Sequence, residues 1–156
     1  MNSFTAHITV ASVVEQDGRF LMVRESVNQS APVLNQPAGH VESGETLIQA
    51  VFRETLEETG WQVEAESLLG TYIFQPAVGQ GIYYRFCFSA RPVSHDPHQR
   101  LDDGIIEACW LSATELKARA NEHRSPLVQR CVDDYLSGRR LPLDAIYQHP
   151  WPLQRG

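Results

Sequence analysis

Residues 39–61 read GHVESGETLIQAVFRETLEETGW, and the acidic run RETLEE at 53–58 is the most informative part of the chain. Glu54, Glu57 and Glu58 stand at positions i, i+3 and i+4, which makes them neighbours on one side of a helix. Three carboxylates this close repel one another unless a cation lies among them, and such hard oxygen ligands suit Mg²⁺ or Mn²⁺. The stretch therefore predicts a helix that carries a metal site.

The same stretch also indicates where that helix begins and ends. Thr46 followed by Gln49 has the pattern of a capping box, and Gly60 is placed to end the helix. Residues at helical spacing, all apolar except Thr55, are expected to form its buried stripe: Leu47, Ile48, Val51, Phe52, Thr55 and Leu56. The carboxylates lie beside this stripe, so we expect them to border a sheet surface that forms one wall of a cleft.

The segments on either side of this helix predict an α+β fold. Apolar runs bounded by turns predict strands at 6–14, 19–24, 67–74, 81–90 and 105–111. Two more helices are expected, over 112–119 from a capping box at Ser112 and over 125–137 from an N-cap at Ser125. This order of elements predicts a mixed sheet between helices, in a single domain over residues 1–156.

Composition and charge argue against several classes of protein. The 13 basic and 19 acidic residues give a net charge of −6 that is spread along the chain, unlike a non-specific binder of nucleic acid or of a membrane surface. No segment approaches the ~20 apolar residues of a membrane-spanning helix, and the stretch MNSFTAHITV lacks the features of a signal peptide. Cys87, Cys109 and Cys131 lack the spacing of a zinc site, so we expect reduced thiols in a cytoplasmic protein.

Seven residues in fixed register resemble the Nudix box, the motif of hydrolases that cleave a nucleoside diphosphate linked to another moiety. They are Gly39, Glu45, Arg53, Glu54, Glu57, Glu58 and Gly60. Thr55 and Trp61 stand where the motif has bulky apolar residues, usually aliphatic, which is a mild departure. The resemblance implies an α/β/α sandwich and a Mg²⁺-dependent hydrolase of a small-molecule diphosphate, with Mn²⁺ as an alternative cation.

The resemblance also implies roles for individual residues. Glu57 and Glu58 would be the core metal ligands, joined by the carbonyl of Ala38, and Glu54 would be either a further ligand or the general base. We therefore predict a metal site formed by these four residues, in which Glu54 and Glu57 also take part in catalysis. Arg53 is predicted to assist catalysis by fixing a carboxylate rotamer, and an ordinary i,i+4 ion pair with Glu57 is compatible with that role.

Members of this family often need an acidic residue outside the box as a base or as an extra ligand. Asp102, Asp103 and Glu107 lie in the region where that residue usually falls, and we favour Asp103. A solvated Asp-Asp-Gly turn is the alternative explanation for this part of the sequence.

Three residues are predicted to contact the substrate. Gly39 allows the backbone to approach a ligand, and Gln36 borders the box on its N-terminal side. Arg85 interrupts an apolar strand, and a charge at such a position must either form a structural ion pair or face a ligand.

Further matches resemble one branch of the family, the NudJ-type phosphatases of proteobacteria. They are NQPAGH at 35–40, Arg85-Phe86, RSPLV at 124–128, YLSGRRLPL at 135–143 and Trp151-Pro152. This branch implies release of orthophosphate from nucleoside di- and triphosphates, and from thiamine or hydroxymethylpyrimidine pyrophosphate. The alternatives are a pyrophosphohydrolase of nucleoside triphosphates or ADP-ribose and a non-catalytic nucleotide sensor. Both a monomer and a homodimer are compatible with the sequence.

Overall fold

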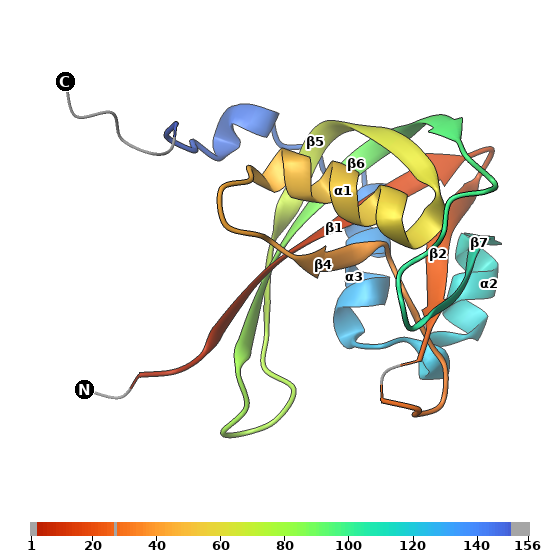
Figure 1. The fold of residues 1–156 in the computed structure, drawn as a ribbon, viewed down its shortest axis with the longest axis horizontal. Helices are drawn as coiled ribbons and strands as arrows, with labels where there is room; N and C mark the ends of the chain where they lie inside the picture. The colour runs from red at the N-terminus through yellow and green to blue at the C-terminus, as the bar shows by residue number, and fades with distance from the viewer. Residues whose placement is uncertain (1–2, 27, 151–156) are drawn as a thin grey trace.

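The computed structural model describes residues 3–26 and 28–150, so the match at Trp151-Pro152 lies outside the described residues. Seven strands form one hydrogen-bonded sheet, whose main path runs in the order β3-β2-β1-β6-β5 (Figure 1). The strands are β1 (Ala6–Gln16), β2 (Arg19–Glu25), β3 (Val33–Asn35), β4 (Ala38–His40), β5 (Trp61–Phe74), β6 (Ile82–His95) and β7 (Ile105–Ser112). β1 and β6 run parallel and the other pairs are antiparallel, which confirms a mixed sheet.

Helices cover both faces of this sheet. They are α1 (Leu47–Thr59), α2 (Ala113–Ala118) and α3 (Pro126–Leu136), with short 3₁₀ turns at η1 (Ala120–Glu122) and η2 (Leu143–Ala145). Val10 on β1 packs with Ala50 of α1, whereas its neighbour Ala11 packs with Cys131 of α3. Because successive side chains of a strand point to opposite faces, α1 and α3 lie on opposite sides of the sheet. The predicted α+β fold with a sheet between helices is confirmed.

The expected helix ends are also confirmed. Thr46 accepts a hydrogen bond from the Gln49 backbone N–H and completes a capping box, and Gly60 ends α1 in the left-handed conformation with φ 76°. Ser112 forms the second capping box, and Ser125 caps α3. These features depend on residues only two to four positions apart, which is why the sequence alone predicts them.

Two features of the fold differ from the expectation. The short strands β3 and β4 lie where the sequence indicated no strands, and β5 begins at Trp61 rather than at residue 67. The predicted buried stripe of α1 is wrong in part, because Ile48 and Phe52 are each 42% exposed while Ala50 and Glu58 are buried. Compared with the predicted orientation, α1 is therefore rotated about its axis so that its acidic side is partly buried and faces β4.

The segment after α3 returns to the beginning of α1. The backbone groups of Leu141 and Leu68 bond in both directions, with N to O distances of 2.8 and 2.9 Å. Further on, the Gln148 side chain accepts a hydrogen bond from the Leu47 backbone N–H at 3.1 Å and donates one to the Glu45 carbonyl at 3.3 Å. The N-terminal end of α1 is therefore held by residues near position 150. No helix among the described residues is long and apolar enough to span a membrane.

Candidate active site

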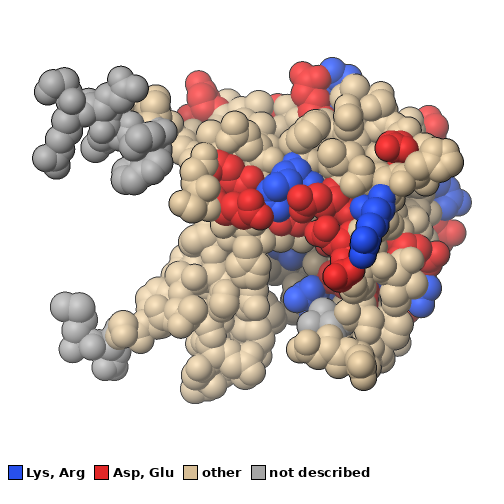
Figure 2. Space-filling view, viewed as in Figure 1, with Lys and Arg blue, Asp and Glu red and all other residues tan. Residues whose placement is uncertain are grey.

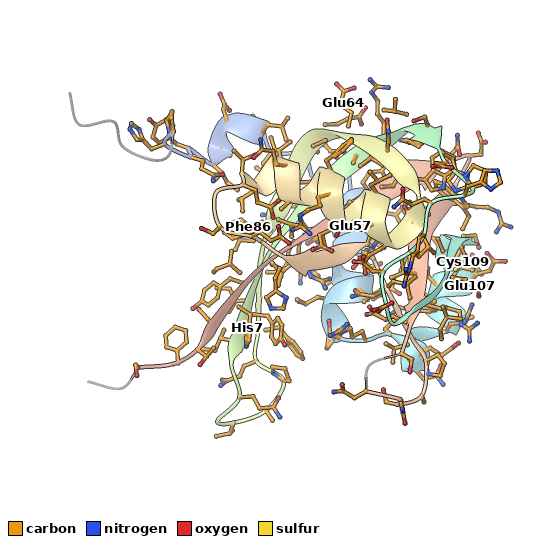
Figure 3. The ribbon with its side chains drawn as sticks, in the orientation of Figure 1. His7, Glu57, Glu64, Phe86, Glu107 and Cys109 are labelled. Carbon is orange, nitrogen blue, oxygen red and sulfur yellow. The ribbon has the colours of Figure 1, made fainter. Side chains whose placement is uncertain are left out.

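Carboxylates from α1 and from the loop before β7 meet beside β4. Oxygen atoms of Glu54, Glu57 and Asp102 all lie within 4.8 Å of one another. The loop is tied to the helix here, because the Asp102 backbone N–H donates to the Glu57 carbonyl at 3.0 Å. Figure 2 shows the acidic side chains of this face gathered along α1, at the edge of a hollow in the surface, and Figure 3 shows Glu57 on the side of α1 that faces β4. Three converging carboxylates fit a hard divalent cation such as Mg²⁺ or Mn²⁺.

Glu58 is the most deeply buried of the α1 carboxylates, at 5% exposure, and it accepts a hydrogen bond from the Ala38 backbone N–H at 2.7 Å. Burial raises the pKa of Glu58 to about 9, although the Ala38 hydrogen bond opposes the shift. Burial also raises the pKa of Glu54, against the opposing effect of Arg53. Both pKa shifts have the same main cause, because burial disfavours the ionised form of a carboxyl group.

Arg53 connects the loop before α1 to the carboxylates of the helix. Its guanidinium forms a forked pair with Glu45 at 3.0 and 2.6 Å. The Nη1 atom donates to Glu54 at 2.7 Å and to Glu57 at 3.2 Å. The Nη2 atom, which also bonds to Glu45, donates to the His40 carbonyl at 3.0 Å. The i,i+4 pair and the wider orienting role are thus both present, and Arg53 limits the rotamers of two carboxylates at once.

Gly39 leaves room for the Glu54 carboxyl group. A Cβ atom added to Gly39 would lie 2.1 Å from Glu54 Cδ and 2.3 Å from each carboxylate oxygen. A side chain at residue 39 would force the Glu54 carboxyl group to move, so glycine is favoured here by close packing rather than by an unusual backbone angle.

The structure separates the three acidic residues that the sequence offered as candidates outside the box. Asp103, the favoured one, has a fully exposed side chain that lies 3.8 Å from Arg100. Glu107 pairs with Arg24 at 3.0 Å and lies on β7 (Figure 3). Only Asp102 is brought to Glu54 and Glu57. The sequence does not distinguish the two adjacent aspartates, because the bond between the loop and α1 decides which one turns inward.

A cavity of about 390 Å³ opens directly beside the carboxylates. Ala38, Gly39 and His40 of β4 form one wall, and Arg85 of β6 contributes a charged group. The start of α3 forms another wall, through Arg124 and residues 125–127. The sequence indicated Ser125 and Pro126 as a helix start and as part of the branch match RSPLV, and neither observation predicted their place in the cavity.

The predicted substrate residues have different positions. Gly39 and Arg85 both line the cavity, whereas Gln36 does not. Gln36 is 1% exposed, accepts a hydrogen bond from Arg85 at 3.0 Å and donates to the Val128 carbonyl at 2.8 Å. It lies behind Arg85, where no substrate reaches it. Arg85 forms no ion pair among the described residues.

Comparison with known proteins agrees with this geometry. The NUDIX domain model matches residues 4–131. Phosphatase NudJ of Escherichia coli (strain K12) is 39% identical over 153 residues, which cover 98% of each chain, and Phosphatase NudJ of Shigella boydii serotype 4 is equally similar. The solved structure of a NUDIX hydrolase from Nitrosomonas europaea matches with a TM-score of 0.91 and 45% identity, over 95% of this chain and 100% of the other. The chain therefore belongs to the Nudix family and is a hydrolase that acts on phosphoric anhydrides.

Proposed function

We propose that this hydrolase depends on Mg²⁺, with Mn²⁺ as a substitute, and releases orthophosphate from nucleoside di- and triphosphates and from thiamine or hydroxymethylpyrimidine pyrophosphate. The observation that carries the proposal is the group formed by Glu54, Glu57 and Asp102 at the edge of the cavity. The similarity to Phosphatase NudJ over 98% of the chain supports the choice of orthophosphate as the product.

The residues that would hold the cation are Glu54, Glu57, Glu58 and the carbonyl of Ala38, joined by Asp102. When bound by these residues, a divalent cation would supply positive charge that compensates the charge of the diphosphate and of the leaving group. The closeness of Glu54, Glu57 and Asp102, together with the raised pKa of Glu54 and Glu58, supports this assignment.

Side chains of the protein would position the carboxylates and accept the proton of the attacking water. Arg53 holds Glu54 and Glu57 in place, so that the carboxylates need no reorganisation during the reaction. A carboxylate accepts a proton from the attacking water, and Glu54 and Asp102 are the two candidates for this base. Asp103, which the sequence favoured, points to solvent, and we assign its role to Asp102.

Two other functions are tested alongside the first. One is a pyrophosphohydrolase of nucleoside triphosphates or of ADP-ribose, which would use the same carboxylates. The other is a non-catalytic nucleotide sensor, and the complete set of box glutamates argues against it, since a sensor has no need of all three. We also propose a cytoplasmic location, which the three free cysteines support.

The decisive experiment measures phosphate released from GDP, GTP, ADP-ribose and thiamine pyrophosphate with Mg²⁺, each with and without added inorganic pyrophosphatase. Orthophosphate from GDP and thiamine pyrophosphate without the helper enzyme is the expected result. A response from GTP that requires the helper enzyme would replace the proposal with a pyrophosphohydrolase. Consumption of ADP-ribose alone would indicate a sugar-nucleotide hydrolase, and nucleotide binding without any turnover would indicate the sensor.

A further inference from the structure

The cavity beside β4 contains a buried positive charge that no carboxylate balances. Arg85 is 8% exposed and lines the cavity. Its guanidinium donates to the side-chain oxygens of Gln36 at 3.0 Å and Asn35 at 3.3 Å, which are neutral amides, and it also interacts with the Cys131 side chain. Burying a charge without a counter-charge is costly, so its retention points to an anion that arrives from outside the protein.

The two amides are themselves held in the orientation that serves Arg85. Asn35 donates through its amide nitrogen to Glu25 at 3.2 Å, and Gln36 donates to the Val128 carbonyl at 2.8 Å. Each amide therefore presents its oxygen to the guanidinium. Arg85 is positioned by these groups while its full charge is kept, which distinguishes it from an arginine that stabilises the fold through an ion pair.

The start of α3 adds a second source of positive potential at the same place. Arg124, Ser125, Pro126 and Leu127 line the cavity, and Ser125 is the N-cap of this 11-residue helix. Backbone N–H groups and the helix dipole at such an end attract anions. Arg124 contributes less net charge than Arg85, because it pairs with Glu25 at 2.6 Å.

The cavity and the carboxylate cluster thus carry opposite charge, although they share a wall. Gly39 contacts the Glu54 carboxylate and also lines the cavity. None of the described residues that line the cavity is acidic. A substrate that spans both regions carries a phosphate near the carboxylates, where a cation would compensate it, and a second anionic group near Arg85.

We propose that Arg85, Arg124 and the N-terminal end of α3 form a subsite for a terminal phosphate dianion. This inference rests on the proposed hydrolase function and narrows it. The enzyme would select di- and triphosphates that end in a free phosphate over diphosphodiesters, in which both phosphates are substituted and each carries a single charge. Asn35 and Gln36 are positioning residues in this arrangement, and they act on the substrate only through Arg85.

The first test measures binding and needs no turnover. Inorganic phosphate is titrated into metal-free protein in the presence of EDTA, by calorimetry, at a pH where phosphate is mainly a dianion. We expect the wild type to bind phosphate and Arg85→Gln to bind it roughly 10- to 100-fold more weakly, the effect of losing a charged hydrogen-bond donor. Arg91→Gln is the matched control, because Arg91 lies on the same strand but is exposed and pairs with Glu64. Equal phosphate binding by wild type and Arg85→Gln would overturn the inference.

The second test uses substrates that differ only at the end of the chain. GDP is compared with the methyl ester of its terminal phosphate, in the presence of Mg²⁺. We expect the wild type to prefer GDP in kcat/KM by about tenfold or more, and Arg85→Gln to lose the preference through a higher KM for GDP alone. Equal rates for the two substrates in the wild type would reject the subsite, even if the variant failed to fold. If neither substrate is hydrolysed, the proposed function fails, and the phosphate titration still decides the subsite.

Discussion

The carboxyl group of Glu54 lies directly against the backbone of Gly39, with no space for a side chain between them. This contact packs α1 against β4, and the same carboxylate lies close to the oxygen atoms of Glu57 and Asp102. The position of this carboxylate, a proposed metal ligand, therefore depends on the absence of a side chain at residue 39 of the neighbouring strand.

We expect Gly39→Ala to damage activity more than stability. The added Cβ would force the Glu54 carboxylate to move, and a shift of about 1 Å in a catalytic group can lower the rate ~100-fold. The accompanying overpacking should cost about 1–3 kcal/mol of unfolding free energy. Gly70→Ala is the control, since a Cβ there meets its nearest atom at an ordinary 3.5 Å. Normal activity in Gly39→Ala would show that Glu54 tolerates displacement.

The adjacent residues Asp102 and Asp103 provide a matched pair of variants. Asp102→Asn removes a charge that faces Glu54 and Glu57, so we expect about a tenfold or larger loss of kcat/KM or a higher Mg²⁺ requirement. Asp103→Asn removes an exposed charge and should leave both quantities unchanged. Titrations of activity against Mg²⁺ for the two variants measure the difference. A loss confined to Asp103→Asn would restore the assignment that the sequence favoured.

Glu57→Gln tests the central carboxylate of the site. The side chain is 38% exposed, and its loss removes one contact to Arg53, so the fold should remain intact. We expect turnover to fall at least ~100-fold, since a charge aimed at the reacting groups is lost. Circular dichroism checks the fold, and phosphate release checks the rate. Near-normal turnover in a folded variant would refute the role of Glu57.

Glu58 predicts how stability changes with pH in metal-free protein. Its pKa is raised by burial to about 9, so the folded state binds this proton more tightly than the unfolded chain does. The stabilisation is complete below the unfolded pKa near 4.5 and is lost as the pH rises toward 9. We therefore expect Tm in EDTA to fall over this range, and to fall less steeply in Glu58→Gln, which does not titrate.

Bound Mg²⁺ should oppose the fall of Tm with rising pH. A divalent cation compensates the ionised carboxylates, so the increase in Tm from saturating Mg²⁺ should be larger near pH 8 than near pH 6, as linkage requires. Thermal melts with Mg²⁺ and with EDTA at both values give the comparison. No increase in Tm with millimolar Mg²⁺ or Mn²⁺ would count against a metal site at these residues.

The sequence predicted best those features that depend on nearby residues. The ends of α1 follow from Thr46, Gln49 and Gly60, which act within one or two turns of the helix. The box residues were placed together for the same reason, because helical spacing alone makes Glu54, Glu57 and Glu58 neighbours.

The features that the sequence did not predict depend on contacts between distant segments. Asp102 rather than Asp103 turns inward because its backbone bonds to Glu57, a residue on another element. Ile48 and Phe52 remain exposed because α1 presents its acidic side to β4. The proposed phosphate subsite likewise combines Arg85 with the start of α3, and no local pattern relates residues 85 and 124.

The hydrogen bonds between the Gln148 side chain and the backbone of Leu47 and Glu45 mean that the working unit is longer than the part matched by the NUDIX domain model. The family model ends at residue 131, yet the loop that carries Glu45, and through it Arg53, is held by the segment that follows. A protein shortened to the boundaries of the family would keep every box residue and lose this attachment. Truncation limits and the placement of a fused tag should therefore be chosen from this contact, not from the boundaries of the family model.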